Sequence, residues 1–240
     1  MPEDRSSKQP PAGDDRNLVV VDEDFVNADA EDRLWLFWER NKDVIVKGTF
    51  AVVVGILAFL AYFFWNESRR EALGEAFTAC QDEAARRAFA AAHPGETLAA
   101  VAMTDVADDL KKAGKFADAA KAYDEANRLA GLAGKSPAVA ALATRARLYS
   151  ALCGLETGAA GADKAIAAVA DDANAPETLR GFAMLTLANV AVAKGDTAEA
   201  TKWLNAMDKK LRAGHVWKSD KEALVQSEPS LVAPAAPAAK

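Results

Sequence analysis

The residues that could bind a metal or act as nucleophiles are few and far apart in this 240-residue chain. It has two cysteines, Cys80 and Cys153, and two histidines, His93 and His215. No C-x-x-C pair occurs, and these four residues lack the spacing of a zinc site. A free cysteine packs like a small apolar residue, which is how we interpret both. We expect no metal and no cofactor, and the sequence leaves open whether Cys80 and Cys153 pair.

The acidic residues do not suggest catalysis either. They occur as adjacent pairs such as Asp108 and Asp109, whose side chains diverge on a helix instead of converging on one atom. His93 precedes a Pro-Gly turn, where it is expected to cap the end of a helix. His215 has no acid or nucleophile at a recognisable spacing. We therefore predict that the protein is not an enzyme.

The charge is concentrated at the N-terminal end. Residues 1–43 carry twelve acidic and six basic side chains, whereas residues 44–240 carry twenty-three of each. No basic stretch is dense enough to neutralise a run of phosphates, which argues against nucleic acid as a partner. Residues 1–28 are predicted to be a disordered acidic tail. Alanine is abundant and β-branched residues are few outside 44–56, so we expect an all-α fold.

Residues 44–65, VIVKGTFAVVVGILAFLAYFFW, are apolar except for Lys47 and Thr49. As a helix they would extend about 33 Å, close to the hydrocarbon thickness of a bilayer. A cleaved signal peptide fits poorly, because the run is long and follows a 43-residue segment. The sequence therefore predicts one transmembrane helix over 44–65. The preceding residues 29–43 contain the aromatic cluster LWLFW and are predicted to form an amphipathic helix on the lipid surface.

Basic residues near the span indicate its direction, because cytoplasmic flanks carry more Lys and Arg. Four lie at its N-terminal end and two at its C-terminal end, namely Arg33, Arg40, Lys42, Lys47, Arg69 and Arg70. This asymmetry favours a cytoplasmic N-terminus, with residues 66–240 on the other side of the membrane.

Small residues follow one face of the predicted span. Gly48, Ala51, Gly55 and Ala58 are spaced three or four positions apart, so a helix places them on one side. Such a face allows another membrane helix to approach closely. Alanine and glycine are also common in spans that meet only lipid, so both interpretations stay open.

The segments 103–126 and 184–207 share a pattern of residue sizes at a distance of 81 positions. Small Ala119 and Ala200 are followed by large Tyr123 and Leu204 at the same interval. A fixed order of small and large residues is typical of helical pairs that pack closely and repeat. A weaker copy covers 160–172, and another lies around 85–92.

These segments resemble tetratricopeptide repeats, in which each unit is a pair of antiparallel helices. Gly114 and Gly195 match the glycine at the inter-helix turn, and Ala107 and Ala188 match the small residue of the first helix. Cys153 would take that small position in the weaker copy. Met103 and Met184 replace the usual aromatic, and the family proline is absent in phase. A generic alanine-rich helical bundle is the alternative.

The order of parts resembles single-pass, membrane-anchored ancillary subunits of the bacterial Sec translocon (the YfgM type). That resemblance implies an all-α protein with one transmembrane helix, a short tetratricopeptide-like α-solenoid over 66–212 and disordered termini. Residues 213–240 end in an Ala/Pro-rich run with nothing to bury and are predicted to be a flexible Ala/Pro tail. It also implies a bacterial inner-membrane protein with a periplasmic repeat domain.

Repeats of this kind present a concave surface lined by the first helix of each pair. The alignment makes eight residues candidates for a peptide groove on it: Val101, Thr104, Asp108, Lys111, Phe182, Leu185, Asn189 and Val192. The apolar ones among them could equally be covered by a neighbouring repeat.

Two functional hypotheses follow. The first is a non-catalytic protein-binding module that assists translocation or chaperone hand-over at the outer face of the inner membrane. Its partners would be the translocon, a chaperone or unfolded chains, together with membrane lipid. The second is a scaffold or assembly factor of an envelope complex, in which the repeats form homo-oligomers.

Overall fold

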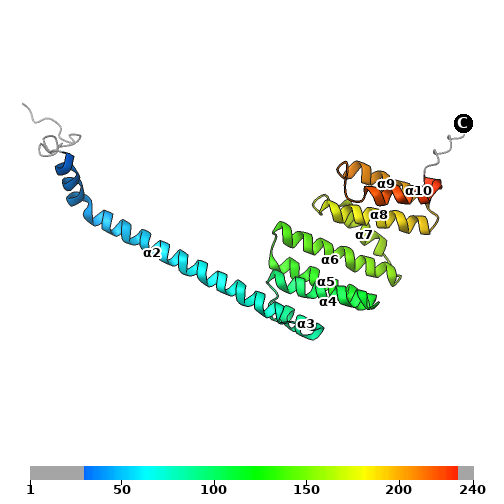
Figure 1. Cartoon of the computed structure of the whole chain (residues 1–240), viewed down its shortest axis with the longest axis horizontal. Helices are drawn as coiled ribbons and strands as arrows, with labels where there is room; N and C mark the ends of the chain where they lie inside the picture. Colours follow the sequence, from blue (N-terminus) through cyan, green and yellow to red (C-terminus); the bar gives the residue numbers. More distant parts are fainter. Residues whose placement is uncertain (1–29, 232–240) are drawn as a thin grey trace, which may run out of the picture. The chain divides into compact units, whose positions relative to one another are not determined.

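The computed structural model describes residues 30–231, with side chains from residue 33. All regular secondary structure in this range is helical (Figure 1). The predicted tail 1–28 and the last nine residues lie outside the described part. The chain divides into two compact units, Met1–Glu67 and Ser68–Lys240. The helices are α2 (Ala30–Thr78), α3 (Glu83–Ala92), α4 (Thr97–Lys112), α5 (Phe116–Ala133), α6 (Pro137–Glu156), α7 (Ala162–Asp171), α8 (Glu177–Ala193), α9 (Thr197–Lys210) and α10 (Lys218–Ser227), followed by the 3-10 turn η2 (Pro229–Leu231).

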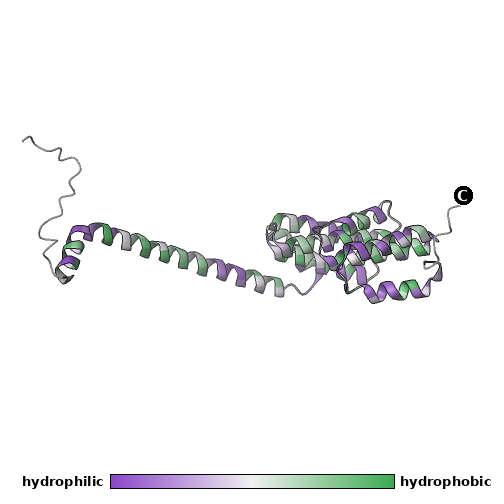
Figure 2. Ribbon diagram, turned by 90° about the horizontal axis from the view of Figure 1, so that it is seen from above, coloured by the Kyte–Doolittle hydropathy of each residue, from purple (hydrophilic) through white to green (hydrophobic). Residues whose placement is uncertain are grey.

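Helix α2 is long and apolar enough to span a membrane. Its most apolar eighteen-residue window has a mean hydropathy of 2.4, and none of that window is buried within the protein. Figure 2 colours the middle of α2 mainly green, for hydrophobic residues. Large apolar side chains such as Phe50, Phe59 and Trp65 are each more than half exposed. Apolar surface of this kind is stable in lipid and costly in water.

The predicted interfacial helix 29–43 is not a separate element. From Ala30 onward it is continuous with the predicted span 44–65 inside α2. No proline or glycine occurs between Ala30 and Lys47, so nothing in the sequence breaks the helix there. Figure 1 shows the dark-blue first turns of α2 bending away from the direction of its cyan part.

In the second unit, three helix pairs are joined by the same kind of turn. Gly114, Gly158 and Gly195 follow α4, α6 and α8 with φ of 75°, 69° and 74°. The amide after each glycine donates to the carbonyl five residues before it, at 2.9, 2.8 and 2.9 Å. This is the Schellman arrangement, which needs a left-handed residue that glycine adopts without strain. The turn reverses the chain, so α4–α5, α6–α7 and α8–α9 are antiparallel pairs.

The small and large residues of the repeated pattern are all in the core. Ala107, Ala119 and Tyr123 are fully buried, and so are Ala188 and Ala200, while Leu204 is 4% exposed. Alanine on one helix leaves room for the large side chain of the next, which explains why the sequence specifies size as well as polarity. Figure 1 shows the pairs stacked one on another.

The weaker copy has a different register from the one expected. Its turn is at Gly158, so the position seven residues earlier, equivalent to Ala107, is Ala151 and not Cys153. Over 160–172 the repeated pattern aligns Ala165 with Ala119 and so predicts it in the core, but Ala165 is exposed and Ile166 is buried instead. The cause is a second positive-φ glycine, Gly161, which begins α7 three residues after the turn. In α4–α5 the cap residue Lys115 follows its glycine directly, and the helix begins at Phe116.

Two hydrophobic clusters form the core of the second unit. The first is built around α3, α4 and α5, and the second around α7, α8 and α9, with α6 contributing to both. The end of α2 belongs to the first, because Leu73 and Phe77 pack against it. The rings of Phe77 and Phe89 meet with centroids 5.8 Å apart.

The chain beyond residue 212 is folded as far as Leu231, which corrects the prediction of a flexible tail over 213–240. Residues 218–227 form α10, and Trp217, Leu224, Val225 and Leu231 pack against the second cluster. The Ala/Pro composition that suggested flexibility begins only at residue 233.

Candidate protein-binding surface

Helices α4, α6 and α8 form one layer of the second unit. Helix α6 contacts both α4 and α8 directly, while α5, α7 and α9 each pack chiefly on their sequence neighbours. We call the exposed side of this layer the α4–α6–α8 face. These three helices share a layer because the turn after each of them leads the chain into the other layer, where α5, α7 and α9 lie.

A polar cluster occupies the α4 end of this face. The Asp108 carboxylate accepts hydrogen bonds from the Tyr123 hydroxyl and, at 2.7 Å, from Nη2 of Arg145. Burial, together with the bond to this carboxylate, raises the pKa of Tyr123 far above its usual value. Burial is the largest single influence on Arg145 and opposes its charge, but the hydrogen bond and the charge of Asp108, together with Tyr149 and Tyr123, outweigh burial and the pKa of Arg145 rises. Tyr123 therefore stays protonated and Arg145 charged.

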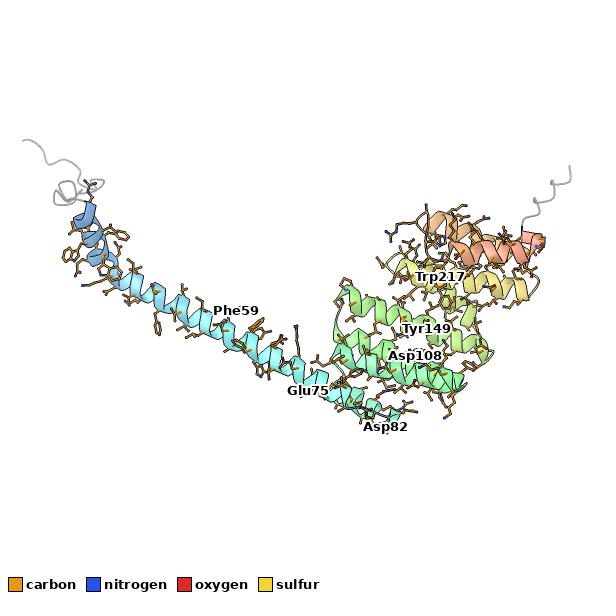
Figure 3. The ribbon with its side chains drawn as sticks, in the orientation of Figure 1. Phe59, Glu75, Asp82, Asp108, Tyr149 and Trp217 are labelled. Atoms are coloured by element: carbon orange, nitrogen blue, oxygen red, sulfur yellow. The ribbon has the colours of Figure 1, made fainter. Side chains whose placement is uncertain are left out.

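Four aromatic rings continue from this cluster along the layer. Ring centroids are 5.6 Å apart between Tyr123 and Tyr149, 6.3 Å between Tyr149 and Phe182, and 5.2 Å between Phe182 and Trp217. We call these four residues the aromatic row. Figure 3 shows Asp108, Tyr149 and Trp217 on successive levels of the stack. Tyr123 is fully buried, whereas the other three rings are half-buried and so present part of their surface to solvent.

Two cations approach the central ring of the row. Lys111 Nζ lies 4.5 Å from the Tyr149 centroid and Arg145 Cζ lies 5.3 Å from it. Both distances are within the range of cation–π attraction. The exposed part of this ring can contact apolar side chains of a ligand. The two basic groups beside it can donate hydrogen bonds to carbonyl or carboxylate oxygens of the same ligand.

The structure brings three of the eight predicted groove residues together. Asp108, Lys111 and Phe182 all lie around Tyr149. Sequence reasoning missed Arg145, Tyr149 and Trp217. The signal for Tyr149 was the single aromatic residue in a helix of mostly small and aliphatic residues, but the weaker copy aligned α6 two residues out of register, with Cys153 in the place of Ala151.

Two of the predicted groove residues are core residues instead. Thr104 is 1% exposed and its hydroxyl donates to the Ala100 carbonyl at 2.8 Å, so its polar group is satisfied within α4. Leu185 is 8% exposed and belongs to the second core cluster. Val101 and Val192 are half-buried. Asn189 is exposed, and its amide donates to the Leu185 carbonyl at 2.9 Å.

Two open grooves lie on the other side of the unit and are related by the internal repeat. One, of about 370 Å³, is lined by α3, α4 and α5; the other, of about 660 Å³, by α7, α8 and α9. Seven lining positions of the first recur 81 residues later in the second: Glu83, Leu110, Lys115, Asp118, Lys121, Ala122 and Glu125 correspond to Lys164, Ala191, Asp196, Glu199, Lys202, Trp203 and Ala206. Both flank a ten-residue helix, α3 or α7, that is shorter than its neighbours.

Within residues 30–231 no group of three His, Cys, Asp or Glu side chains is placed to hold a metal ion. Cys80 and Cys153 are both free thiols. Burial raises the pKa of Cys153, so its thiol is unreactive at neutral pH.

The small-residue face of α2 is not covered by any other described part of the chain. A Cβ added at Gly48 or Gly55 would meet no atom within 4 Å.

No known family, no curated protein and no solved structure matches this chain.

Proposed function

We propose that residues 66–231 form a tetratricopeptide-like α-solenoid. Three observations support this: antiparallel pairs closed by the same glycine turn, buried alanines at the repeated small positions, and a lining pattern that recurs at 81 residues. In such a fold the first helices of successive pairs, here α4, α6 and α8, line one continuous surface.

On this basis the protein is a membrane-anchored, non-catalytic protein-binding module. The observation that carries this function is the aromatic row, with Lys111 and Arg145 around Tyr149. Aromatic residues and arginine dominate the binding energy of protein interfaces. Apolar side chains of a bound segment would lie on the rings, and its backbone carbonyls would accept from the two cations.

Helix α2 is the proposed anchor, in the bacterial inner membrane, with the N-terminus in the cytoplasm and the repeats in the periplasm. The excess of basic residues before the apolar run supports this direction. There the protein would assist chains emerging from the translocon or pass them to a chaperone.

Binding is tested with the full chain in lipid nanodiscs and a fluorescently labelled, reduced and carboxymethylated polypeptide that cannot fold. Fluorescence anisotropy should show saturable binding. Tyr149→Ala should weaken it by about thirty-fold, the effect of losing one interface hot spot of about 2 kcal/mol. Phe116→Ala is the control, because it removes a half-buried aromatic ring from α5 in the other layer. Absence of binding, or equal losses in both variants, would reject the proposal.

The direction of the anchor is tested with single cysteines engineered at residues 1–17 or 219–230, in a background without the native ones. A reagent that crosses only the outer membrane should label the second position and not the first. The reverse pattern would place the repeats in the cytoplasm and remove the translocon-side function.

A scaffold acting by self-association is the second candidate, favoured by the uncovered small-residue face of α2. Light scattering after size exclusion separates the two. A dimer or larger assembly that ignores the unfolded polypeptide supports the scaffold, and a monomer that binds it supports the binding module.

A further inference from the structure

Residues 211–231 follow α9 and return over α8; we call this segment the latch. Helix α10 contacts α8, and η2 contacts both α9 and α10. The latch therefore covers the α8 end of the second unit, beside Phe182, the last ring of the aromatic row before Trp217.

The α8 surface is shaped to receive the Trp217 indole. The indole stacks on Phe182 with an interplanar angle of 22°, and its Nε1 donates to the Thr178 carbonyl at 2.7 Å. Position 181 is glycine, and a Cβ there would overlap Cδ1 of Trp217. The site thus offers an aromatic face, a hydrogen-bond acceptor and a gap left by a missing side chain.

The rest of the latch after Leu211, which is buried, is packed less closely than the indole. Leu224, Val225 and Leu231 contact the second cluster but stay half-buried, and Lys221 forms an ion pair with Asp208. None of the residues of α10 is buried. Two cavities of about 300 Å³ each flank the loop before Trp217, and both are lined by Arg212–His215. His215 Nδ1 and, on α8, Arg180 Nε are buried and have no hydrogen-bond partner within residues 30–231. The ion pair of Arg212 with Glu177 at 2.6 Å is exposed on the arginine side, where such a pair contributes little.

After Leu211 no latch side chain is fully buried, and one unsatisfied nitrogen lies in the latch (His215 Nδ1) and one under it (Arg180 Nε). Such a segment opens at lower free energy than the core. Opening would expose Gly181 and Phe182. It would leave the site of the Trp217 indole, at the end of the aromatic row, empty for another side chain. It would also free Arg180 Nε and His215 Nδ1 to hydrogen-bond water or a ligand.

We propose that the latch is an internal ligand of the α4–α6–α8 face and is displaced by a partner segment that places its own tryptophan or phenylalanine on Phe182. This inference rests on the proposed binding function and adds the chemistry of the partner: an extended, unfolded segment carrying an aromatic side chain. Trp217 is thus an autoinhibitory residue as well as a structural one.

The test uses the full chain in nanodiscs and two unfolded peptides of the same sequence except at one position. That position is tryptophan in one peptide and alanine in the other. Because the closed latch reduces the population able to bind, Trp217→Ala should tighten binding of the tryptophan peptide by about tenfold or more. Trp217→Phe, which keeps a ring, should stay near the wild type. Leu129→Ala removes a buried side chain from the first core cluster and is the control for general destabilisation.

Hydrogen–deuterium exchange gives an independent readout. Addition of the tryptophan peptide should speed exchange over 218–227 and slow it over 179–185. Binding without faster exchange in 218–227, or tightening of equal size in Leu129→Ala, would overturn the latch and leave the binding function standing. Equal affinity for the two peptides would overturn the assigned aromatic chemistry. Binding to neither the wild type nor Trp217→Ala would overturn both proposals.

Discussion

Replacing Gly181 by alanine should destabilise the protein, although alanine is the better helix former. In the interior of a helix, glycine to alanine stabilises by about 1 kcal/mol. At position 181 the added Cβ would overlap Trp217 and lie 3.1 Å from Cδ1 of Leu211. Overpacking of this kind costs about 1–3 kcal/mol. Loss of the indole from its site would cost a similar 2–3 kcal/mol. The clash therefore outweighs the helix propensity, and the net loss should be about 1 kcal/mol.

Gly131→Ala is the matched control. Gly131 lies near the end of α5, and a Cβ there meets no atom within 4 Å. It should stabilise by about 0.5–1 kcal/mol, since only the helix propensity changes. For a unit of this size 1 kcal/mol corresponds to about 2–4 °C, so thermal unfolding followed by circular dichroism should move the two variants in opposite directions.

A double-mutant cycle isolates the cause. In a Trp217→Ala background the clash is absent, so Gly181→Ala should become stabilising, with a coupling of about 2 kcal/mol between the two sites. If Gly181→Ala were as stabilising as Gly131→Ala in the wild-type background, the indole would not occupy this site. The latch would then have no aromatic anchor on α8.

Three further outcomes are expected. Asp105 is half-buried and burial raises its pKa, so its charge is unfavourable in the folded state. Asp105→Asn should therefore be more stable than the wild type at pH 7, as measured by urea titration. This difference in stability should shrink as the pH falls through the raised pKa of Asp105. A loss of stability on this substitution would mean that Asp105 is held by its basic neighbours instead. Thr104→Val should change polypeptide binding by less than about twofold and stability by less than about 1.5 kcal/mol, because the Thr104 hydroxyl bonds only within its own helix; a large drop in anisotropy-measured affinity would return Thr104 to the binding surface. Maleimide labelling of Cys153 in the native protein should be slow compared with a cysteine engineered at 219–230, and fast labelling would show that its thiol is accessible.

Patterns that depend on local geometry could be predicted from the sequence. A long apolar run defines a helix able to cross a membrane whatever follows it. The turns at Gly114 and Gly195 were predictable because a left-handed residue between two periodic helices has few alternatives to glycine. The alternation of Ala119 with Tyr123 reports close packing directly, since residue size is written in the sequence.

Features that depend on tertiary packing could not be predicted in the same way. Asp108 and Arg145 are 37 residues apart, and no local pattern links them. Thr104 and Leu185 were assigned to a groove because helical periodicity places them on the same side of α4 and α8 as the other candidates. Whether a residue on that side is exposed or buried depends on how closely the neighbouring helix packs, which periodicity does not give. The latch was hidden because residues 213–217 are polar or small apart from Val216 and Trp217, and the partner of Trp217 is a gap, Gly181.

The division of the core around α6 has a consequence for how the second unit comes apart. Val139, Ala146 and Cys153 belong to the first cluster, whereas Leu148 and Ala151 belong to the second. A single helix therefore joins two halves that otherwise hold themselves together. Under mechanical force or on heating, the C-terminal half can unfold as far as α6 while the N-terminal half stays folded. Such a protein would yield in steps, and each step would begin where the chain is farthest from its anchor in sequence.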